Sequence, residues 1–236
     1  NRREWCEMTG YDGSEAQLQA IRNLASLPID FTCSMVITPE NVQSLCESVQ
    51  IAHDNGAKQF SFTFIIDNDD AKEKDLAYLQ KHDPIKLVSD FISQIDKLSA
   101  ITDDWWVEYS FPMCMYTEEQ LKLLKGRLAT PCQIHLKNAV TFNTKMELLP
   151  CDMYVYQRLG KFGRDFSSYQ GFLSLTESAN YSKTMDEIRR LPSDECTTCE
   201  HFGVCYGGCP VLWKNYSFSA LKEFKAKAHH SGVSGE

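Results

Sequence analysis

Alternating helical and strand-like patterns run through the first half of the chain. Apolar residues recur every three or four positions in four stretches, which predicts amphipathic helices near residues 14–25, 39–55, 84–99 and 117–126. Runs rich in β-branched and aromatic residues predict strands between them, at residues 32–38, 60–67 and 106–112. Strands separated by helices of this length predict a parallel sheet built from βαβ units, and therefore an α/β fold class.

Capping and turn residues mark the ends of these helices. Side-chain N-caps are expected at three positions, Ser14, Thr38 and Thr117. Pro39 is then expected in the first turn of its helix, which Gly56 ends. Because ligands bind at the carboxyl ends of parallel strands, the polar residues Thr38 and Asp67 are expected to line any pocket there.

Charge and composition narrow the function classes. The 236 residues include 24 Lys and Arg and 32 Asp and Glu, interleaved along the chain, for a net charge of −8. This balance argues against nucleic-acid binding, which needs a basic face. The chain has no apolar run of about 18 residues, and its first residues lack the hydrophobic run of a signal peptide, so no membrane association and a cytoplasmic location are expected. Ten cysteines without an export signal favour reduced thiols and metal ligands over disulfides.

The densest group of candidate metal ligands lies in the segment from Cys196 to Cys209. Its sequence is CTTCEHFGVCYGGC, in which four cysteines have the spacing C-x2-C-x5-C-x3-C. Thiolates are soft ligands that suit zinc and iron-sulfur clusters. The glycines of this run let the backbone approach a metal group closely. Zinc sites more often pair two such knuckles across a gap of roughly a dozen residues, so iron-sulfur and zinc both stay open, beside plain structural thiols.

Two further cysteines flank a predicted hairpin upstream. The segment between Cys132 and Cys151 alternates in polarity around a turn at Asn143 and Thr144. Such a hairpin would carry both thiols to one end of a small sheet, as a second pair of ligands. The alternative is a hairpin with two buried, inert thiols.

The combined pattern, C-x13-M-x4-C followed by the quartet, resembles the SPASM extension of radical S-adenosylmethionine enzymes. The residues before Cys151 and the CYGGCP ending carry the likeness, whereas Met146 stands where that family has glycine. The resemblance implies two auxiliary [4Fe-4S] clusters, the first on Cys132, Cys151 and Cys209 and the second on Cys196, Cys199 and Cys205.

Each of these clusters would be one cysteine short, because the seventh cysteine of the family pattern is absent from the sequence. Cys114 is a candidate fourth ligand for the first cluster, with a buried inert thiol as its alternative. For the second cluster His229 and His230 are candidates, since histidine replaces cysteine on some irons. A polar terminal tail is the alternative there.

The first half resembles the later part of the radical S-adenosylmethionine core, through a TG-x-DGS loop, a strand ending in IT-x-x-N and an NGA turn. The resemblance implies that Asn41 and Arg3 contact the cofactor. The family's C-x3-C-x2-C motif, which holds the cluster that cleaves S-adenosylmethionine, does not occur in these residues. Residues 1–127 are thus expected to form the C-terminal part of a partial parallel (β/α) barrel, and 128–236 a SPASM-like domain.

This resemblance implies a function for the chain. The chain would be the auxiliary-cluster portion of an enzyme that modifies a peptide or protein. S-adenosylmethionine would bind only if the missing half of the barrel is supplied, for example by a partner chain that covers the open sheet edge. No acid–base or nucleophile pattern identifies a catalytic residue. The alternatives are a non-catalytic iron-sulfur protein for electron transfer or accessory roles, and a zinc-stabilised binding module.

Overall fold

The computed structural model describes residues 6–7, 10–66, 74–108, 111–129 and 132–231, the side chains of 228–231 excepted. The chain divides into two compact units. The first comprises residues 1–65 and 83–129, and the second comprises residues 66–82 and 130–236. The segment 66–82 therefore interrupts the first unit and belongs to the second.

Four parallel strands form the sheet of the first unit, in the order β1-β2-β3-β4. They are β1 (Thr32–Ile37), β2 (Gln59–Phe64), β3 (Trp105–Glu108) and β4 (Leu128–Ala129). Strands β1 and β2 pair along their full length, from Thr32 opposite Gln59 to Ile37 opposite Phe64. The expected α/β class with a parallel sheet is confirmed.

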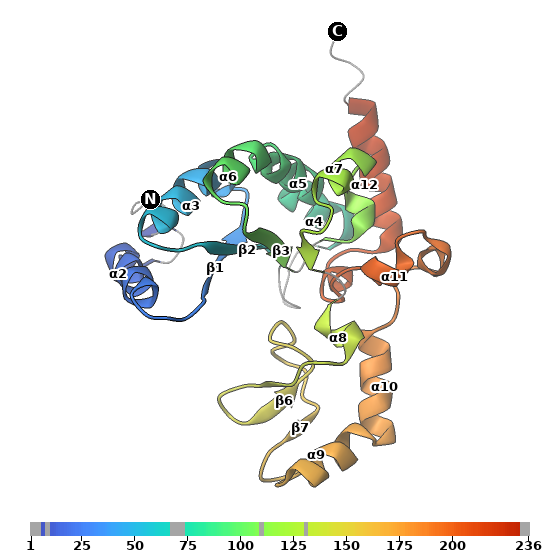
Figure 1. Ribbon diagram of the computed structural model, residues 1–236. Coiled ribbons are helices and arrows are strands. Elements are labelled where there is room, and N and C mark those ends of the chain that lie inside the picture. The colour runs from blue at the N-terminus through green and yellow to red at the C-terminus, as the bar shows by residue number, and fades with distance from the viewer. Residues whose placement is uncertain (1–5, 8–9, 67–73, 109–110, 130–131, 232–236) are drawn as a thin grey trace. The chain divides into compact units, whose positions relative to one another are not determined.

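Helices α3 (Leu45–Asp54), α5 (Pro84–Ile92) and α6 (Ile95–Ile101) lie along one face of this sheet (Figure 1). Aromatic rings hold α5 to the strands. The Phe91 ring centroid lies 5.7 Å from that of Phe62, 5.5 Å from Phe64 and 6.2 Å from Trp105. These four side chains are almost fully buried, so the apolar area that they remove from water is a main source of stability in this unit.

The helix predicted over 84–99 is in fact two helices, α5 and α6, because the chain turns at Ser93 and Gln94. The Ser93 hydroxyl donates to the Asp90 carbonyl at 2.6 Å, a local bond that competes with helix continuation. Gln94 is 7% exposed, and the Cys46 thiol lies 3.6 Å from its carbonyl oxygen. This tertiary contact is invisible in the local pattern.

Two of the three predicted caps are wrong. Helix α2 (Ser14–Ala25) begins after Gly13 without a side-chain cap, and the Ser14 hydroxyl instead bonds to Asp12. After Thr38 the chain makes a turn, and only then come the 3-10 helix η1 (Val42–Ser44) and α3. The third cap is confirmed, since Thr117 and Gln120 form a capping box at the start of α7 (Glu118–Leu123).

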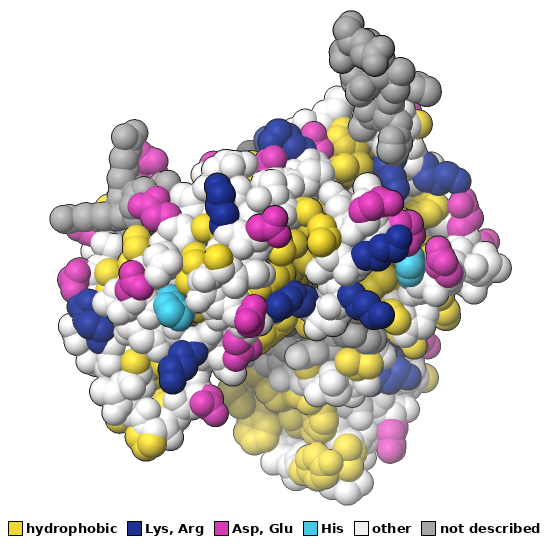
Figure 2. Space-filling view, turned by 45° about the horizontal axis from the view of Figure 1, so that its top comes forward, with side chains coloured by type: hydrophobic (Ala, Val, Ile, Leu, Met, Phe, Trp, Pro, Cys, Tyr) yellow, Lys and Arg dark blue, Asp and Glu magenta, His cyan; other side chains and the backbone are white. Residues whose placement is uncertain are grey.

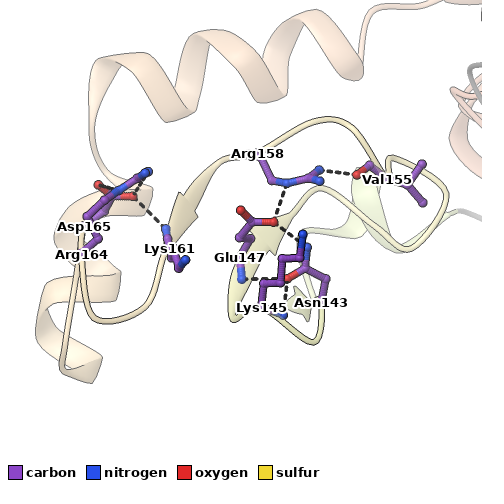
Figure 3. Close-up of polar contacts among 8 residues, drawn as sticks. All are labelled: Asn143, Lys145, Glu147, Val155, Arg158, Lys161, Arg164 and Asp165. Atoms are coloured by element: carbon purple, nitrogen blue, oxygen red, sulfur yellow. Dashed lines mark hydrogen bonds and ion pairs between the residues drawn. The ribbon is translucent and has the colours of Figure 1, made fainter.

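A small antiparallel sheet anchors the second unit. It comprises β5 (Thr141–Phe142), β6 (Glu147–Leu149) and β7 (Gly160–Lys161), in that order. The predicted hairpin is confirmed, and Figure 3 shows the polar contacts that fix its turn. The Asn143 side-chain oxygen accepts from the N–H groups of Lys145 and Glu147, at 2.9 and 3.0 Å. The Glu147 carboxylate in turn accepts from Arg158 at 2.7 Å.

Short helices precede and follow this sheet along the chain. They are α8 (Gln133–Leu136), α9 (Tyr169–Thr176), α10 (Ala179–Ile188) and α11 (Phe202–Cys205). The helix predicted over 183–190 is the second half of α10, whereas α8, α9 and α11 are too short to give a clear period. Helix α12 (Phe218–Ser231) packs against α4 (Asp75–His82). The Asp75 carboxylate accepts from the N–H and hydroxyl of Ser217 at 2.8 and 2.9 Å, which ties the two helices together.

Met146 adopts the left-handed backbone region, with φ of 59°, at the place where the resembled family has glycine. A side chain there costs about 1–2 kcal/mol, while glycine carries an extra chain-entropy cost of about 0.5–1 kcal/mol. Because the Met146 side chain is 47% exposed, it adds little packing. We expect Met146→Gly to raise the free energy of unfolding by about 0.5 kcal/mol in urea denaturation. Met146→Ala keeps the strained backbone, so a gain of the same size there would contradict this explanation.

Charges of both signs are interleaved on the face of the molecule drawn in Figure 2, in agreement with the mixed charge pattern of the sequence. Among the described residues, no helix combines the length and the apolar composition that crossing a bilayer requires.

Candidate metal centre

All six candidate cysteine ligands lie in the second unit, and each begins a tight turn. In every turn the N–H three positions on donates to the cysteine carbonyl, with N···O distances of 2.8–3.3 Å. The paired residues are Cys132 and His135, Cys151 and Tyr154, Cys209 and Leu212, Cys196 and Cys199, Cys199 and Phe202, and Cys205 and Gly208. Turns of this kind leave backbone N–H groups directed toward the side chain that begins them.

Three of these thiols, Cys132, Cys151 and Cys209, lie close enough to affect one another's ionisation, and we call them the first triad. Burial raises the pKa of Cys209 to about 12, with a further contribution from Cys132 and Cys151. Burial also raises the pKa of Cys151 to about 11, and Asp152 and Cys132 add to this rise. Burial raises the pKa of Cys132 in the same direction. The thiols thus stay protonated until a cation compensates their charge.

Backbone donors surround the sulfurs of the first triad. At each cysteine, the backbone N–H groups two and three positions on lower the pKa of the thiol and so partly offset the rise caused by burial. The donors are Ile134 and His135 at Cys132, Met153 and Tyr154 at Cys151, and Val211 and Leu212 at Cys209. This repeated arrangement suits a metal-bound thiolate, whose negative charge such donors stabilise.

The other three thiols form a second triad, Cys196, Cys199 and Cys205. Burial raises the pKa of Cys196, and the neighbouring Cys205, Cys199 and Glu195 add to the rise. This triad is nearer to solvent, since Cys199 is exposed and the other two are partly exposed. Besides burial, the cysteines that raise the pKa of Cys209 are Cys132 and Cys151, which are distant in sequence.

The spacing of the sulfurs bears on the kind of metal group that fits. All ten cysteines are free thiols, and among the described residues no three cysteine sulfurs lie within 4.8 Å of one another. Thiolates bound tetrahedrally to one zinc at about 2.3 Å lie roughly 3.8 Å apart. A cluster of several irons takes each cysteine on a separate iron, so its ligands are spread more widely. The described cysteine sulfurs are therefore not gathered around a position for a single zinc ion, and a cluster of several irons stays a prediction from the sequence.

The remaining predicted residues are not brought to this centre by any described contact. Cys114 lies in the 3-10 helix η2 (Met113–Met115) of the first unit. Arg3, Asp67 and the side chains of His229 and His230 lie outside the described residues. Their roles as cofactor or cluster ligands stay predictions.

Asn41 is placed by the structure at the end of β1, where it has a clear structural role. It is 3% exposed; its side-chain oxygen accepts from the Thr38 N–H at 2.9 Å, and its amide nitrogen donates to the Val36 carbonyl at 2.8 Å. These bonds close the turn that replaces the expected start of a helix at Pro39. That Asn41 also contacts a cofactor stays a prediction.

We expect Asn41→Ala to lower the free energy of unfolding by about 2–3 kcal/mol, because the Thr38 N–H and Val36 carbonyl lose a buried partner. Urea denaturation measures this change. Gln50→Ala is the matched control, since it removes an exposed amide that bonds to Asp54 at 2.7 Å, and its effect should stay within about 0.5 kcal/mol. Equal effects of the two variants would contradict a structural role for Asn41.

Two side chains of the centre were not predicted. The Trp213 indole N–H donates to the Gly207 carbonyl at 2.6 Å and so holds the glycine loop between Cys205 and Cys209. The His135 ring stacks on Tyr206, with centroids 5.6 Å apart and planes at 25°. Both contacts join residues of different turns, and no spacing in the sequence indicates such contacts.

Comparisons with known proteins give a structural match but no match in sequence. No family model matches the chain, and no curated protein matches it. Among solved structures, the chain is similar to Streptococcus suis SuiB in its crystal structure bound to S-adenosylmethionine, at 15% identity and a TM-score of 0.47. The match covers 87% of this chain and 48% of that one, so the chain spans about half the length of SuiB. A likeness at this level assigns neither a family nor a chemistry to the chain.

Proposed function

We propose that the second unit holds two iron-sulfur clusters, one on each triad, and that they serve as auxiliary clusters in radical S-adenosylmethionine chemistry on a peptide or protein. The observation that supports this most strongly is the grouping of six cysteines into two triads. Cys209 lies with Cys132 and Cys151, as the resemblance to the SPASM extension implies for the first cluster. A single zinc knuckle would instead join Cys209 to its neighbours in sequence.

The surroundings of the first triad support a cluster that is shielded from solvent. Cys209 is 7% exposed, and paired backbone donors face each sulfur of this triad. Burial and N–H···S bonds are two of the means by which proteins set the potential of an iron-sulfur cluster. When bound, such clusters would supply electron storage; the chain's own residues hold the thiolates, exclude water and stabilise negative charge.

In this proposal residues 1–127 are part of a (β/α) barrel, and residues 128–236 are the SPASM-like domain. Cleavage of S-adenosylmethionine would depend on a C-x3-C-x2-C segment supplied outside these residues, for example by a chain that completes the barrel. The substrate would be a peptide or protein segment. Asn41 and Arg3 would then contact the cofactor.

A second candidate function is electron transfer without radical chemistry. The second triad favours it, because Cys199 is exposed and a cluster there would lie near enough to the surface to exchange electrons with a partner. In that case the chain is an accessory iron-sulfur protein, and S-adenosylmethionine has no place to bind.

Two measurements on anaerobically reconstituted chain test these functions. Spectroscopically monitored titration with dithionite should show two reducible centres, whereas a chain that takes up zinc and stays colourless would contradict the cluster proposal. Equilibrium dialysis with S-adenosylmethionine, carried out in the presence of a chain that completes the barrel, should then show binding that Asn41→Ala weakens. Two reducible centres without any cofactor binding under that condition would favour the electron-transfer alternative.

A further inference from the structure

His135 lies at the junction of the two triads. Its backbone belongs to the turn that begins at Cys132, since its N–H donates to the Cys132 carbonyl at 2.9 Å. It sits in α8, whose Ile134 carbonyl accepts from Arg189 Nε at 2.9 Å. The hydrogen bond from Arg189 holds this short helix in place, and with it the backbone that carries the half-buried His135 ring.

The ring itself reaches the loop that joins the two triads in sequence. Burial and Arg189 lower the pKa of His135, and the nearby backbone of Gly208, the residue before Cys209, acts in the opposite direction. The ring also stacks on Tyr206, the residue after Cys205, at 5.6 Å between centroids. One side chain therefore contacts both the approach to Cys209 of the first triad and the exit from Cys205 of the second.

Contacts tie the loop that His135 touches to the neighbouring turn at Cys205. Tyr206, Gly207 and Gly208 all have positive φ, of 48°, 82° and 75°. The Gly208 N–H donates to the Cys205 carbonyl at 2.8 Å, and the Tyr206 ring packs 5.3 Å from that of Phe202. A shift of the loop would thus move Cys205 and Cys209 together.

We propose that His135 is a positioning residue that couples the two triads, by holding the loop 206–208 against α8. The inference rests on the proposed function. If both triads hold clusters, the iron content and the reduction potential of both clusters depend on this one side chain. The ring stack supplies the contact with the second triad. The place of His135 in the turn that begins at Cys132, with its N–H 2.9 Å from the Cys132 carbonyl, supplies the contact with the first.

Three variants separate these contributions. His135→Ala removes both contacts, His135→Phe keeps the ring stack, and His135→Asn keeps a donor toward Gly208. We expect His135→Ala to lower iron and sulfide at both triads and to shift both reduction potentials. His135→Asn should restore the first triad more than the second, and His135→Phe the reverse. His53→Ala, in α3 of the first unit, is the control and should change nothing.

A second readout needs no metal. In the apo chain we expect alkylation of Cys209 to be about fivefold faster in His135→Ala, the factor that loss of a contact about as strong as one ordinary hydrogen bond produces. Mass spectrometry of iodoacetamide-treated chain measures it. Unchanged alkylation, or unchanged loading with unchanged potentials, would overturn the inference. Wild-type chain that holds no cluster would overturn the proposed function alone, because the alkylation rate still decides the role of His135.

Discussion

Replacing Cys209 by alanine will remove the same half of the bound iron as replacing Cys132 or Cys151. The reason is that the Cys209 thiol lies with those two, although Cys205 is only four positions away in the chain. Each single variant should lose about four of about eight irons, the content of one [4Fe-4S] cluster. Iron and sulfide analysis of anaerobically reconstituted variants measures the loss.

Double variants sharpen this result. Cys132→Ala combined with Cys209→Ala should lose no more than either alone, because both cysteines serve one cluster. Cys196→Ala combined with Cys209→Ala should abolish iron binding, because they serve different clusters. Cys33→Ala, which lies in β1 of the first unit, is the control and should keep full iron. If Cys209→Ala instead matches Cys196→Ala and adds nothing to it, the two-triad arrangement is wrong.

Gly207→Ala will destabilise the second unit and impair both triads. Gly207 has φ of 82°, and a Cβ there would lie 2.8 Å from Cδ of Pro192, part of a rigid ring that cannot rotate away. The combined backbone strain and overlap should cost about 3 kcal/mol of unfolding free energy. Since this loop carries Cys205 and Cys209 on either side, iron loading should fall at both triads.

Gly163→Ala separates strain from overlap. Gly163 has φ of 84°, but no atom beyond the two adjacent residues lies within 4 Å of the position that its Cβ would take. It therefore bears only the backbone cost, about 1 kcal/mol, and iron loading should stay at the wild-type level. Equal losses in urea denaturation for the two variants would show that Pro192 does not confine the loop.

The parts of the fold that are determined locally could be predicted from the sequence. Strands β1 and β2 follow from their β-prone runs, and the parallel order follows from the helices between them. The hairpin at Asn143 follows from its turn residues. The break at Gln94 could not be predicted, because the apolar period continues through it and the Cys46 contact beside it comes from a different helix. Likewise nothing in the local sequence shows that Asn41 would close a turn ahead of α3.

The candidate site divides in the same way. Spacing alone points to Cys196, Cys199, Cys205 and Cys209 as one group, because neighbours in sequence are assumed to be neighbours in space. The resemblance to the SPASM extension implies the different grouping of Cys209. Burial, with a further contribution from Cys132 and Cys151, raises the pKa of Cys209, which agrees with that grouping. The backbone donors at each sulfur and the ring of His135 depend on turns and packing, so no spacing rule reveals them.

The most direct test of the account is the content of iron, zinc and acid-labile sulfide in the wild-type chain, purified and reconstituted without oxygen. Two clusters predict about eight irons and about eight sulfides per chain, with no zinc. One or two zinc ions and no sulfide would contradict the account, and would leave the two triads as structural metal sites.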